Sequence, residues 1–471
     1  MMSALLAALP LSLGPLHDGL ADLPPQFELL TIPATLTQPT DIESLPGLGL
    51  LVSEKRGTVA HFRHFPGEPF PVMQDVPVLN LISEVNVQGD RGLLGLAVAP
   101  DFTPDGGDSS WLYLLYTASP VPGADLLFNQ DDQYSHSMLT RYALELDPAG
   151  RLVAIPESRE VLLGERLPDG TAPDAIASLH ESHSNGSIAF APDGTLLFST
   201  GDGAHFDTTD FGGIDPPGFD DYVHPTTGLR GQLPLEQDSG AFRSRDLRSL
   251  AGKVLRVDPT TGLGLDSNPY YDGDPTSLRS RVWASGFRNA FRLTHRPGTG
   301  ATDPALADVG QWLVGDVGNT RTEELDLIDA PGLDFGWPCF EGFADSPGYA
   351  SFVRPDPNPF GWLDCADGGP GPVRGPLLAI DHVQAQALQP LGLHKTLAGE
   401  AGAGFTGACV VGGDFFAGGD YPAEYQGRYL FSDYASGWLR SASLDAAGNL
   451  VEVTDFGAGL SRPTCITFDA T

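Results

Sequence analysis

The stretch GSIAFAPDGTLLFSTGD, residues 186–202, decides the fold prediction for this chain. Two apolar runs of strand length flank Pro192-Asp193-Gly194, a tripeptide typical of tight turns, so the stretch predicts a β-hairpin. The phrase LAVAPDF at 96–102 closely matches IAFAPDG at 188–194. A repeated strand phrase indicates a fold built from copies of one β-unit.

Eight further segments show the same alternating or briefly all-apolar pattern, with Gly, Pro, Asp or Asn at their ends. Short β-meanders repeated along 471 residues predict an all-β chain with radial repetition, which is a β-propeller. The long loops at 203–249 and 340–406 are expected to gather over one face, at one mouth of the central channel. The eight segments are residues 47–64, 111–117, 137–147, 250–262, 281–293, 312–329, 407–416 and 427–445.

Acidic residues dominate the charge of the chain, with Asp+Glu 61 against Lys+Arg 26 and a formal net charge of -35. This balance argues against nucleic acid as a partner, because nucleic-acid binding requires a basic face. It leaves two readings open: a solvated acidic surface, or carboxylates that bind divalent cations. No apolar run is long enough to cross a membrane, so no membrane span is expected.

The N-terminal residues 1–25 contain a short apolar segment with no basic residue before it. The segment is read either as a signal or leader segment or as a start inside a longer protein. Residues 26–471 are then expected to form a single propeller domain.

Four cysteines lie late in the chain, and none belongs to a CxxC pair, which argues against zinc. Their even number in a turn-rich chain suggests disulfides, with Cys339–Cys365 and Cys409–Cys465 as the expected pairs. Disulfides require an oxidising compartment, so the chain is expected to be secreted or periplasmic.

His183 precedes the hairpin with the spacing H-x-x-G-x-I-x-F-x-P-D-G, where a strand is expected to start at the channel mouth. Imidazole titrates near neutral pH, which suits it to take a proton from a hydroxyl group. Two other readings stay open: a hydrogen-bonded structural histidine, or a metal ligand together with His180. The loop beyond the hairpin carries Asp202 as a candidate calcium ligand, with further acids at Asp207, Asp210 and Asp215; the alternative is a solvated acidic loop.

Three further motifs place polar or aromatic groups at predicted strand ends. GFRNAF carries Arg288 and Asn289, which suit an oxyanion or carbonyl ligand but would equally form a salt bridge between blades. GDVGNTRTEELDLI forces an irregular backbone at Gly315–Asn319, whose carbonyls could face a hard cation, with Glu323-Glu324 close behind. Trp337, on a Gly-Trp-Pro corner, would either stack on a planar ligand or pack between blades.

Seven motifs follow one another over about residues 40–470: RGLLGLAVAPDF, HSNGSIAFAPDG, STGDG, LAGKVLRVDP, GFRNAF, GDVGNTRTEELDLI and DFGWPCFEG. In this order they resemble the soluble quinoprotein glucose/sorbosone dehydrogenases, including the aldose sugar dehydrogenases. The resemblance implies a six-bladed propeller with pyrroloquinoline quinone (PQQ) over the central channel and calcium bound to cofactor and scaffold. The implied activity is oxidation of an aldose sugar at its anomeric carbon to the lactone, with an external electron acceptor.

The resemblance also implies roles for individual residues. His183 would be the general base that takes the proton of the anomeric hydroxyl while a hydride passes to the quinone. Arg288 and Asn289 would stabilise the charge that develops at the reacting quinone carbonyl. The backbone carbonyls of Gly318 and Asn319 would ligate the calcium that holds the cofactor.

Further cofactor-binding positions follow from the same comparison. Asp90 falls where the family places an amide or acid facing the substrate site, and Trp337 matches a residue near the cofactor. Arg462 looks like one of the late arginines that pair with the cofactor's carboxylates. Because PQQ is a polyanion, its binding to a chain of charge -35 would need a local cluster of Arg288, Arg440 and Arg462 together with a calcium bridge.

The chain departs from the family pattern at three places. The family's late lysine against the cofactor is missing: that segment reads FSDYASGWLRS, and Lys395 lies well upstream. Ser182 replaces the acid that precedes the base in some members. The sequence stops at FDAT, so either the last blade is closed by the N-terminal strand or the chain is truncated there. Related propellers such as the hedgehog-interacting proteins have no redox role. The alternative function is therefore a non-catalytic, secreted, calcium-binding propeller that binds a protein or carbohydrate partner.

Overall fold

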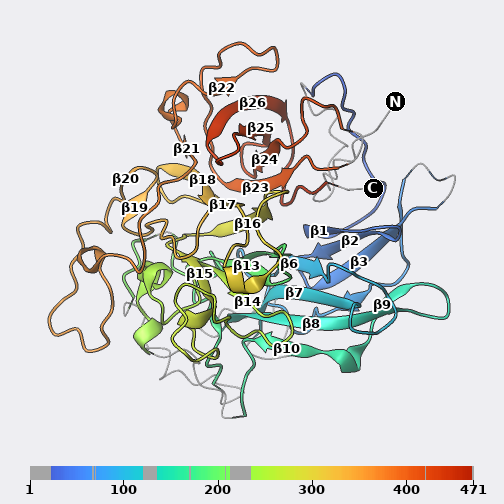
Figure 1. The fold of residues 1–471 in the computed structure, drawn as a ribbon, viewed down its shortest axis with the longest axis horizontal. Coiled ribbons are helices and arrows are strands. Elements are labelled where there is room, and N and C mark those ends of the chain that lie inside the picture. The colour runs from blue at the N-terminus through green and yellow to red at the C-terminus, as the bar shows by residue number, and fades with distance from the viewer. Residues whose placement is uncertain are drawn as a thin grey trace.

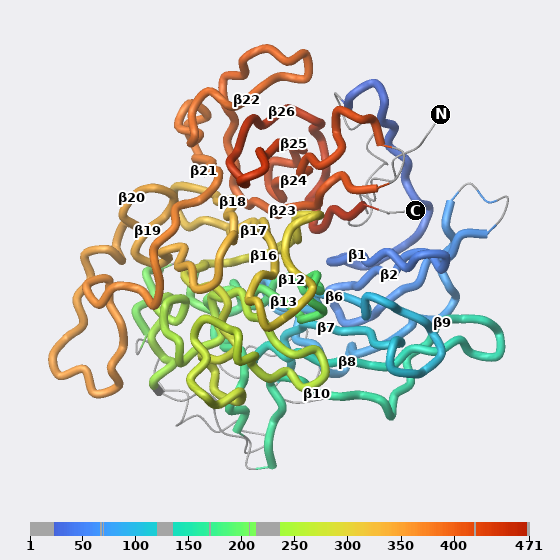
Figure 2. The backbone as a smooth tube through the Cα atoms, in the orientation of Figure 1, coloured from blue at the N-terminus to red at the C-terminus, as the bar shows by residue number. Residues whose placement is uncertain are grey.

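The computed structural model describes residues 23–65, 68, 70–119, 135–168, 171–206, 208–212, 235–418 and 421–468. Over these residues the chain forms an all-β propeller, in which antiparallel sheets follow one another around a common centre (Figure 1). The chain passes from sheet to sheet in sequence order, from blue to red in Figure 2. The predicted fold class is confirmed in this respect.

Five large sheets form the blades, numbered here in chain order. Blade 1 contains β1 (Pro39–Leu45), β2 (Gly49–Glu54), β3 (Thr58–Arg63), β4 (Val72–Met73) and β5 (Leu79–Asn80). Blade 2 contains β6 (Leu93–Val98), β7 (Trp111–Ala118), β8 (His136–Leu146), β9 (Leu152–Ala154), β10 (Glu160–Leu163) and β11 (Ile176–Ala177). Blade 3 contains β12 (Asn185–Phe190), β13 (Leu196–Thr200), β14 (Lys253–Val257) and β15 (Val282–Ser285).

Blade 4 contains β16 (Ala290–His295), β17 (Trp312–Asp316), β18 (Thr322–Ile328) and β21 (Leu378–Asp381). Blade 5 contains β23 (Val410–Phe415), β24 (Tyr429–Asp433), β25 (Trp438–Leu444), β26 (Leu450–Ala458) and the short parallel strand β22 (His394–Lys395). A separate hairpin joins β19 (Phe340–Glu341) to β20 (Ala344–Asp345). The helical elements of the described residues are short 3-10 turns: η2 (Pro156–Ser158), η3 (Leu235–Gln237), η4 (Gly240–Arg245), η5 (Arg279–Arg281), η6 (Pro304–Leu306), η7 (Cys365–Asp367) and η8 (Ala385–Ala387).

The core lies between successive blades, which explains why several strands are apolar on both faces. In β7, Leu114 packs toward blade 1 together with Leu51, whereas its neighbour Leu115 packs toward blade 3 together with Phe198. Consecutive residues of a strand point to opposite faces, so an all-apolar run is buried against two neighbouring blades. Each fully buried leucine or phenylalanine contributes about 1.5–3 kcal/mol to stability.

The first strands of the five blades surround the axis, with β1, β6, β12, β16 and β23 in contact in that order. Arg292, on β16, reaches across this centre and donates hydrogen bonds to the carbonyls of Thr464 at 2.8 Å, Leu94 at 2.7 Å and Thr40 at 2.5 Å. One buried guanidinium thus ties three chain segments together at the axis.

The prediction of six blades is wrong for the described residues, because chain segments rather than a sheet lie between blade 5 and blade 1. Residues 463–468 run alongside β1 and β23: Thr464 Oγ1 donates to the Pro39 carbonyl at 3.0 Å, and the Phe468 N–H donates to Asp414 at 3.0 Å. Phe27 packs on the apolar face of blade 5, and Ile32 packs on that of blade 1. These residues bury the two faces that a sixth blade would otherwise cover.

One of the two expected disulfides is present. Cys339 and Cys365 are bonded, with Cα atoms 5.6 Å apart. The expected Cys409–Cys465 bond is wrong, because both sulfurs are free. Cys409 lies at the start of blade 5, where its N–H donates to Asp433, whereas the Cys465 thiol contacts Asp41 of blade 1.

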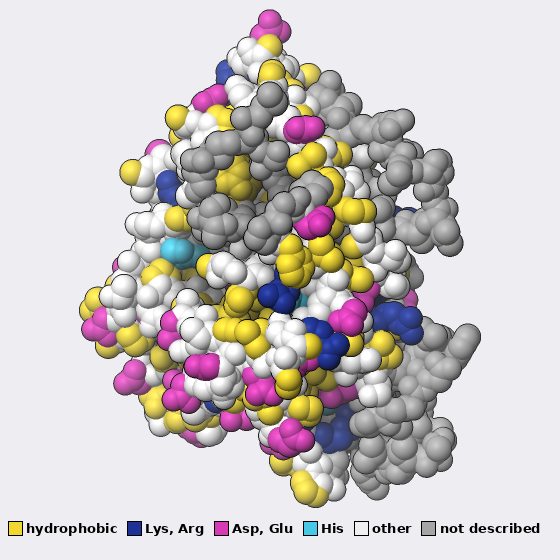
Figure 3. Space-filling view, turned by 90° about the vertical axis from the view of Figure 1, so that its right-hand side faces the viewer, with side chains coloured by type: hydrophobic (Ala, Val, Ile, Leu, Met, Phe, Trp, Pro, Cys, Tyr) yellow, Lys and Arg dark blue, Asp and Glu magenta, His cyan; other side chains and the backbone are white. Residues whose placement is uncertain are grey.

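The described residues contain no helix long and apolar enough to cross a membrane. On the face drawn in Figure 3, acidic side chains are spread among apolar and neutral ones instead of gathering in one patch. The negative charge of the chain is therefore distributed over this face.

Candidate active site

Loops from several blades meet at one end of the propeller, which we call the mouth; it comprises residues 88–91, 180–185, 201–206, 286–289, 317–322 and 407–409. Hydrogen bonds join neighbouring loops of this set. The Asp90 N–H donates to the Glu181 carbonyl at 2.7 Å, and the Val317 N–H donates to the Asn289 carbonyl at 3.2 Å. Gly201 pairs with Asn289 in an isolated bridge.

His183 lies just before β12, and its side chain is held by the loop that follows β13. Its Nδ1 is 2.9 Å from Asp202 Oδ1, and the residue is 4% exposed. The backbone adopts the left-handed region at His183, with φ of 53°, and the Gly203 N–H donates to its carbonyl at 2.9 Å. A Cβ at Gly201 would lie 2.3 Å from the His183 carbonyl oxygen, so only glycine fits at this close approach.

Asp202 is fully buried and accepts three hydrogen bonds within the mouth. Besides His183, the Ala204 N–H donates to Oδ1 at 2.9 Å, and Trp337 Nε1 donates to Oδ2 at 2.7 Å. Burial opposes ionisation of this carboxyl, but the neighbouring His183 and these hydrogen bonds lower its pKa below the usual value. Asp202 is therefore an ionised acceptor that orients the imidazole.

The electrostatic surroundings keep His183 neutral at physiological pH. Burial lowers the pKa of His183, and the positive charge of Arg288 adds to this effect, while Asp202 and Asp90 act against it. In the neutral ring, Nδ1 carries the proton that it donates to Asp202, so Nε2 has a free lone pair. None of the described residues forms a hydrogen bond with Nε2, so this atom can accept a proton from a ligand.

Arg288 and Asn289 lie between β15 and β16, and the carboxylate of Asp316 fixes their backbone. The Arg288 N–H donates to Asp316 at 2.9 Å and the Asn289 N–H donates at 2.6 Å. The Arg288 guanidinium lies 5.5 Å from the ring centre of Trp337, the same ring that donates to Asp202. His183 and Arg288, distant in the sequence, therefore converge in one mouth.

Asp90 is also brought to the mouth, where it lies close enough to raise the pKa of His183. Beside it is Lys55, from the turn between β2 and β3, which donates to the Gly89 carbonyl. Burial lowers the pKa of this lysine, whereas Asp90 and Glu181 raise it. Sequence reasoning did not identify Lys55 as a site residue, although its place in the Lys-Arg-Gly turn of the first hairpin put it at a strand end.

Gly318 and Asn319, the predicted calcium ligands, lie in the turn between β17 and β18. The Arg288 guanidinium donates to the carbonyls of Val317 at 3.1 Å and Gly318 at 2.6 Å, and to Asn319 Oδ1 at 3.4 Å. This turn thus presents carbonyl oxygens to a cation, here the side chain of Arg288.

Buried carboxyls lie directly behind this turn, on β17 and β18. Burial raises the pKa of Asp316 to about 7, and burial together with mutual repulsion raises the pKa of Glu324 and Asp326 well above the usual range. Asp326 is 0% exposed, and neither of its carboxylate oxygens has a hydrogen-bond partner. Carbonyl and carboxylate oxygens are the donors that calcium prefers, so these residues fit a hard cation by type. The described residues hold no ready group of three or more metal-ligating side chains.

The remaining predicted residues have other surroundings. Arg440, on β25, pairs with Asp455 at 3.2 Å and lies over the rings of Phe405 and Trp438, so its guanidinium already has partners within the protein. Arg462 is exposed in the segment that follows blade 5.

The acidic residues of the loop after β13 have protein partners. The carboxylate of Asp202 accepts hydrogen bonds from His183, Ala204 and Trp337, so the geometry does not support its prediction as a calcium ligand. Asp207 and Asp215 lie outside the described residues, and Asp210 accepts the N–H groups of His205 and Gly212.

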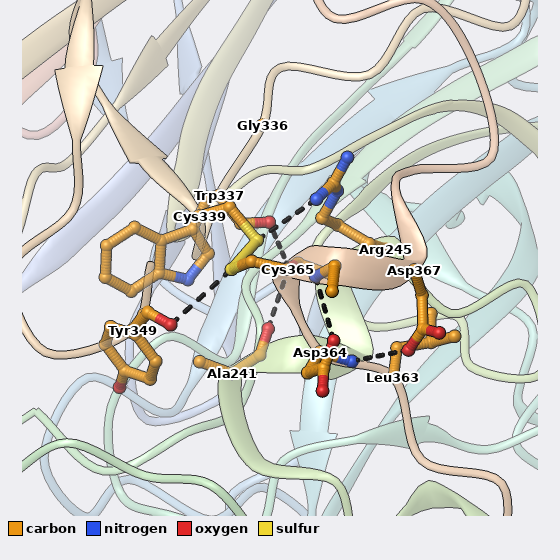
Figure 4. The surroundings of a disulfide bond; sticks show 12 residues. Ala241, Arg245, Gly336, Trp337, Cys339, Tyr349, Leu363, Asp364, Cys365 and Asp367 are labelled. Carbon is orange, nitrogen blue, oxygen red and sulfur yellow. Dashed lines mark hydrogen bonds between the residues drawn. A yellow bond between two sulfur atoms is a disulfide. The ribbon is translucent and has the colours of Figure 1, made fainter. Parts of the chain in front are cut away.

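Trp337 is held by a buried cluster next to the disulfide (Figure 4). Tyr349 packs edge-on against the Trp337 ring, with ring centres 5.2 Å apart. Cys339 of the disulfide follows Trp337 by two residues. Arg245 donates to Cys339 Sγ at 3.1 Å and to Asp334 at 2.7 Å. The long loop at 340–406 therefore supports the site, because its residues hold Trp337, whose Nε1 donates to Asp202.

Comparisons with known proteins agree with this architecture. A model of the family described as Glucose / Sorbosone dehydrogenase matches residues 36–212 and 210–347. The solved structure of the PQQ-bound form of aldose sugar dehydrogenase from Streptomyces coelicolor has a TM-score of 0.53 at 18% identity, and the match covers 92% of this chain and 86% of that one. At this level of identity the likeness shows a shared fold.

Two curated relatives match at low identity. The HIPL2 protein of Arabidopsis thaliana is 23% identical over 419 residues, which cover 82% of this chain and 49% of that protein. Quinoprotein glucose dehydrogenase B of Acinetobacter calcoaceticus is 24% identical over 269 residues, covering 56% of this chain and 43% of that protein. The matches thus span about half the length of these relatives or less. Because the family model matches most of the chain, this protein belongs to the glucose/sorbosone dehydrogenase family.

Proposed function

We propose that the protein is a PQQ-dependent dehydrogenase that oxidises an aldose sugar at its anomeric carbon to the lactone. The observation that carries the proposal is the Asp202–His183 pair, with its neutral, free Nε2, in the same mouth as Arg288. When bound, PQQ supplies a two-electron acceptor that takes the anomeric hydride and is reoxidised by an external electron acceptor.

The chain's own residues would carry out the proton transfer and stabilise the charges that develop. His183 Nε2 takes the proton of the anomeric hydroxyl, and Asp202 stabilises the imidazolium that forms. Arg288 and Asn289 would stabilise the negative charge that develops at the reacting quinone carbonyl. The substrate thus loses one proton to the protein and one hydride to the cofactor, which balances a two-electron oxidation to the lactone.

Local charge has to overcome the acidic character of the chain if a polyanionic cofactor is to bind. Arg288 and Lys55 supply cationic groups at the mouth, and the carbonyls of Gly318 and Asn319 would hold a calcium ion, which would add positive charge there. Lys55 offers a lysine at the mouth in place of the late lysine that the sequence lacks. A secreted or periplasmic location is part of the proposal, because the Cys339–Cys365 disulfide requires an oxidising compartment.

The test is to add PQQ and CaCl2 to the apo-protein and to screen aldoses with an artificial electron-accepting dye. We expect calcium-dependent PQQ binding and sugar-dependent dye reduction. His183→Ala should lower kcat by about 10²–10⁴-fold and leave PQQ affinity unchanged, because the imidazole acts as a base. A His183→Ala variant that retains the wild-type rate would show that another group is the base.

The second candidate function is a non-catalytic, calcium-binding propeller that binds a protein or carbohydrate partner. The pairing of Arg440 with Asp455 favours it, because this arginine is then not free to bind a cofactor carboxylate. Wild-type protein that neither binds PQQ in the presence of calcium nor reduces the dye with any aldose would support this function over the dehydrogenase.

A further inference from the structure

The turn between β17 and β18 is organised around a carboxylate from a different part of the chain. Glu341 Oε1 accepts four consecutive backbone N–H groups: Asn319 at 2.9 Å, Thr320 at 2.9 Å, Arg321 at 2.8 Å and Thr322 at 3.2 Å. Successive N–H groups that converge on one anion form a backbone nest, and the anion determines the conformation of the turn.

The nest also determines where the carbonyls of the turn point. While its N–H groups bind Glu341, the carbonyls at the start of the turn, those of Val317 and Gly318, both accept hydrogen bonds from Arg288. Gly318 is required at this bend, because a Cβ there would lie 1.9 Å from the Thr322 carbonyl oxygen. The turn therefore links Glu341 on one side to Arg288 and the candidate calcium carbonyls on the other.

Glu341 is placed for this task by β19 and the disulfide before it. It is 2% exposed, and it follows Cys339 by two residues in a hairpin that pairs it with Ala344. Its second oxygen, Oε2, is buried without a hydrogen-bond partner. Within the described residues, no arginine or lysine forms a salt bridge with Glu341. The four N–H groups therefore compensate the cost of burying its carboxylate.

We propose that Glu341 is a positioning residue that holds the 317–322 turn in the conformation in which its carbonyls can bind calcium and its contacts orient Arg288. This inference rests on the proposed function, because it assigns the turn to calcium-dependent cofactor binding. A group that orients a metal ligand through a hydrogen bond typically changes metal affinity by about 10–100-fold when it is removed.

The experiment compares Glu341→Ala and Glu341→Gln with the wild type and with the control Asp258→Ala. Asp258 Oδ1 also accepts four hydrogen bonds, from the backbone and hydroxyl groups of Thr260 and Thr261, but in the turn that follows β14. Calcium affinity is measured by titration calorimetry, PQQ affinity at saturating calcium, and the exchange of individual amides by hydrogen–deuterium exchange. Steady-state kinetics give kcat and KM separately.

We expect Glu341→Ala to weaken calcium and PQQ binding by about 10–100-fold and to speed exchange at amides 319–322. Glu341→Gln keeps one acceptor oxygen, so it should fold and recover part of the affinity, whereas Asp258→Ala should bind as the wild type does. Affinities for both Glu341 variants within twofold of the wild type would overturn the proposal. If Glu341→Ala does not fold, Glu341→Gln decides, because wild-type exchange and affinity in that variant would mean that the carboxylate does not position the turn.

The two proposals fail in different ways. Wild-type protein that binds no PQQ in calcium rejects the dehydrogenase function itself. Wild-type protein that binds PQQ, with Glu341 variants that bind it equally well, rejects only the positioning role.

Discussion

Replacing Asp202 with asparagine tests the central pair of the site with almost no change in shape. The carboxylate is surrounded by donors only: His183 Nδ1 at 2.9 Å, the Ala204 N–H at 2.9 Å and Trp337 Nε1 at 2.7 Å. Asparagine has one acceptor oxygen and one NH₂ group, so its NH₂ group must face either His183 or Trp337.

Each orientation has a calculable cost. If the NH₂ group faces His183, it replaces Oδ1 and also opposes the Ala204 N–H. Nδ1 must then become the acceptor and the ring proton moves to Nε2, which removes the lone pair that the base needs. The same substitution beside the catalytic histidine of a serine protease lowers kcat about 10⁴-fold through the wrong tautomer. If the NH₂ group faces Trp337 instead, two buried donors oppose each other, and an unsatisfied buried donor costs about 1–3 kcal/mol of stability.

We therefore expect Asp202→Asn to lower kcat by about 10²–10⁴-fold, with PQQ affinity within a few-fold of the wild type. Dye-linked kinetics at saturating PQQ and calcium measure the rate, and thermal unfolding shows whether the fold persists. Asp210→Asn is the control, because Asp210 accepts only the N–H groups of His205 and Gly212 through its described contacts. A folded Asp202→Asn variant with kcat within threefold of the wild type would refute the reasoning.

Three other predictions follow from the same geometry. Trp337→Phe keeps a smaller aromatic ring but deletes the 2.7 Å hydrogen bond to ionised Asp202, and should lower the free energy of unfolding by at least about 1.5–3 kcal/mol. A loss below about 0.5 kcal/mol in chemical denaturation would contradict this. Because burial lowers the pKa of His183, the acidic fall of kcat/KM should have its midpoint below the usual histidine pKa of about 6.5, and a pH–rate profile with its midpoint at pH 7 or above would disagree. Burial raises the pKa of Asp326, so its contribution to stability is present at low pH and is lost as pH rises. With calcium removed by a chelator, Asp326→Asn should therefore be more stable than the wild type at pH 8. The difference in stability should be smaller at pH 5.

The sequence predicted the blades well because their signal is local. The run from Trp111 to Thr117 is apolar on both faces, and the structure buries Leu114 and Leu115 against different blades. The number of blades is not a local property. It depends on what fills the space between β23 and β1, and residues 463–468, which carry no recognisable strand–turn–strand pattern, lie there.

The same distinction separates the site residues that sequence patterns could find from those that they could not. His183 and Arg288 stand inside motifs, and the structure brings both to one mouth. The acidic, glycine-rich loop predicts a calcium ligand at Asp202, because a local pattern does not show that its carboxylate oxygens accept from His183 and from the distant Trp337. Arg440 was expected at the cofactor because it is a late arginine, whereas its position on β25 turns it to Asp455. Glu341 was missed because its partners are the backbone N–H groups of another loop.

The carboxylates of the mouth show how so acidic a chain can offer a cationic site. Asp316 accepts the N–H groups of residues 288 and 289, Glu341 accepts those of residues 319–322, and Asp433 accepts those of residues 408, 409, 435 and 436. Backbone N–H groups therefore offset part of the cost of burying these carboxyl groups, which form hydrogen bonds with the backbone and not with the Arg288 guanidinium. The Arg288 guanidinium correspondingly donates only to carbonyl and amide oxygens and forms no salt bridge among the described residues. Its full positive charge remains available to an anionic ligand, which a bulk charge of -35 would otherwise repel.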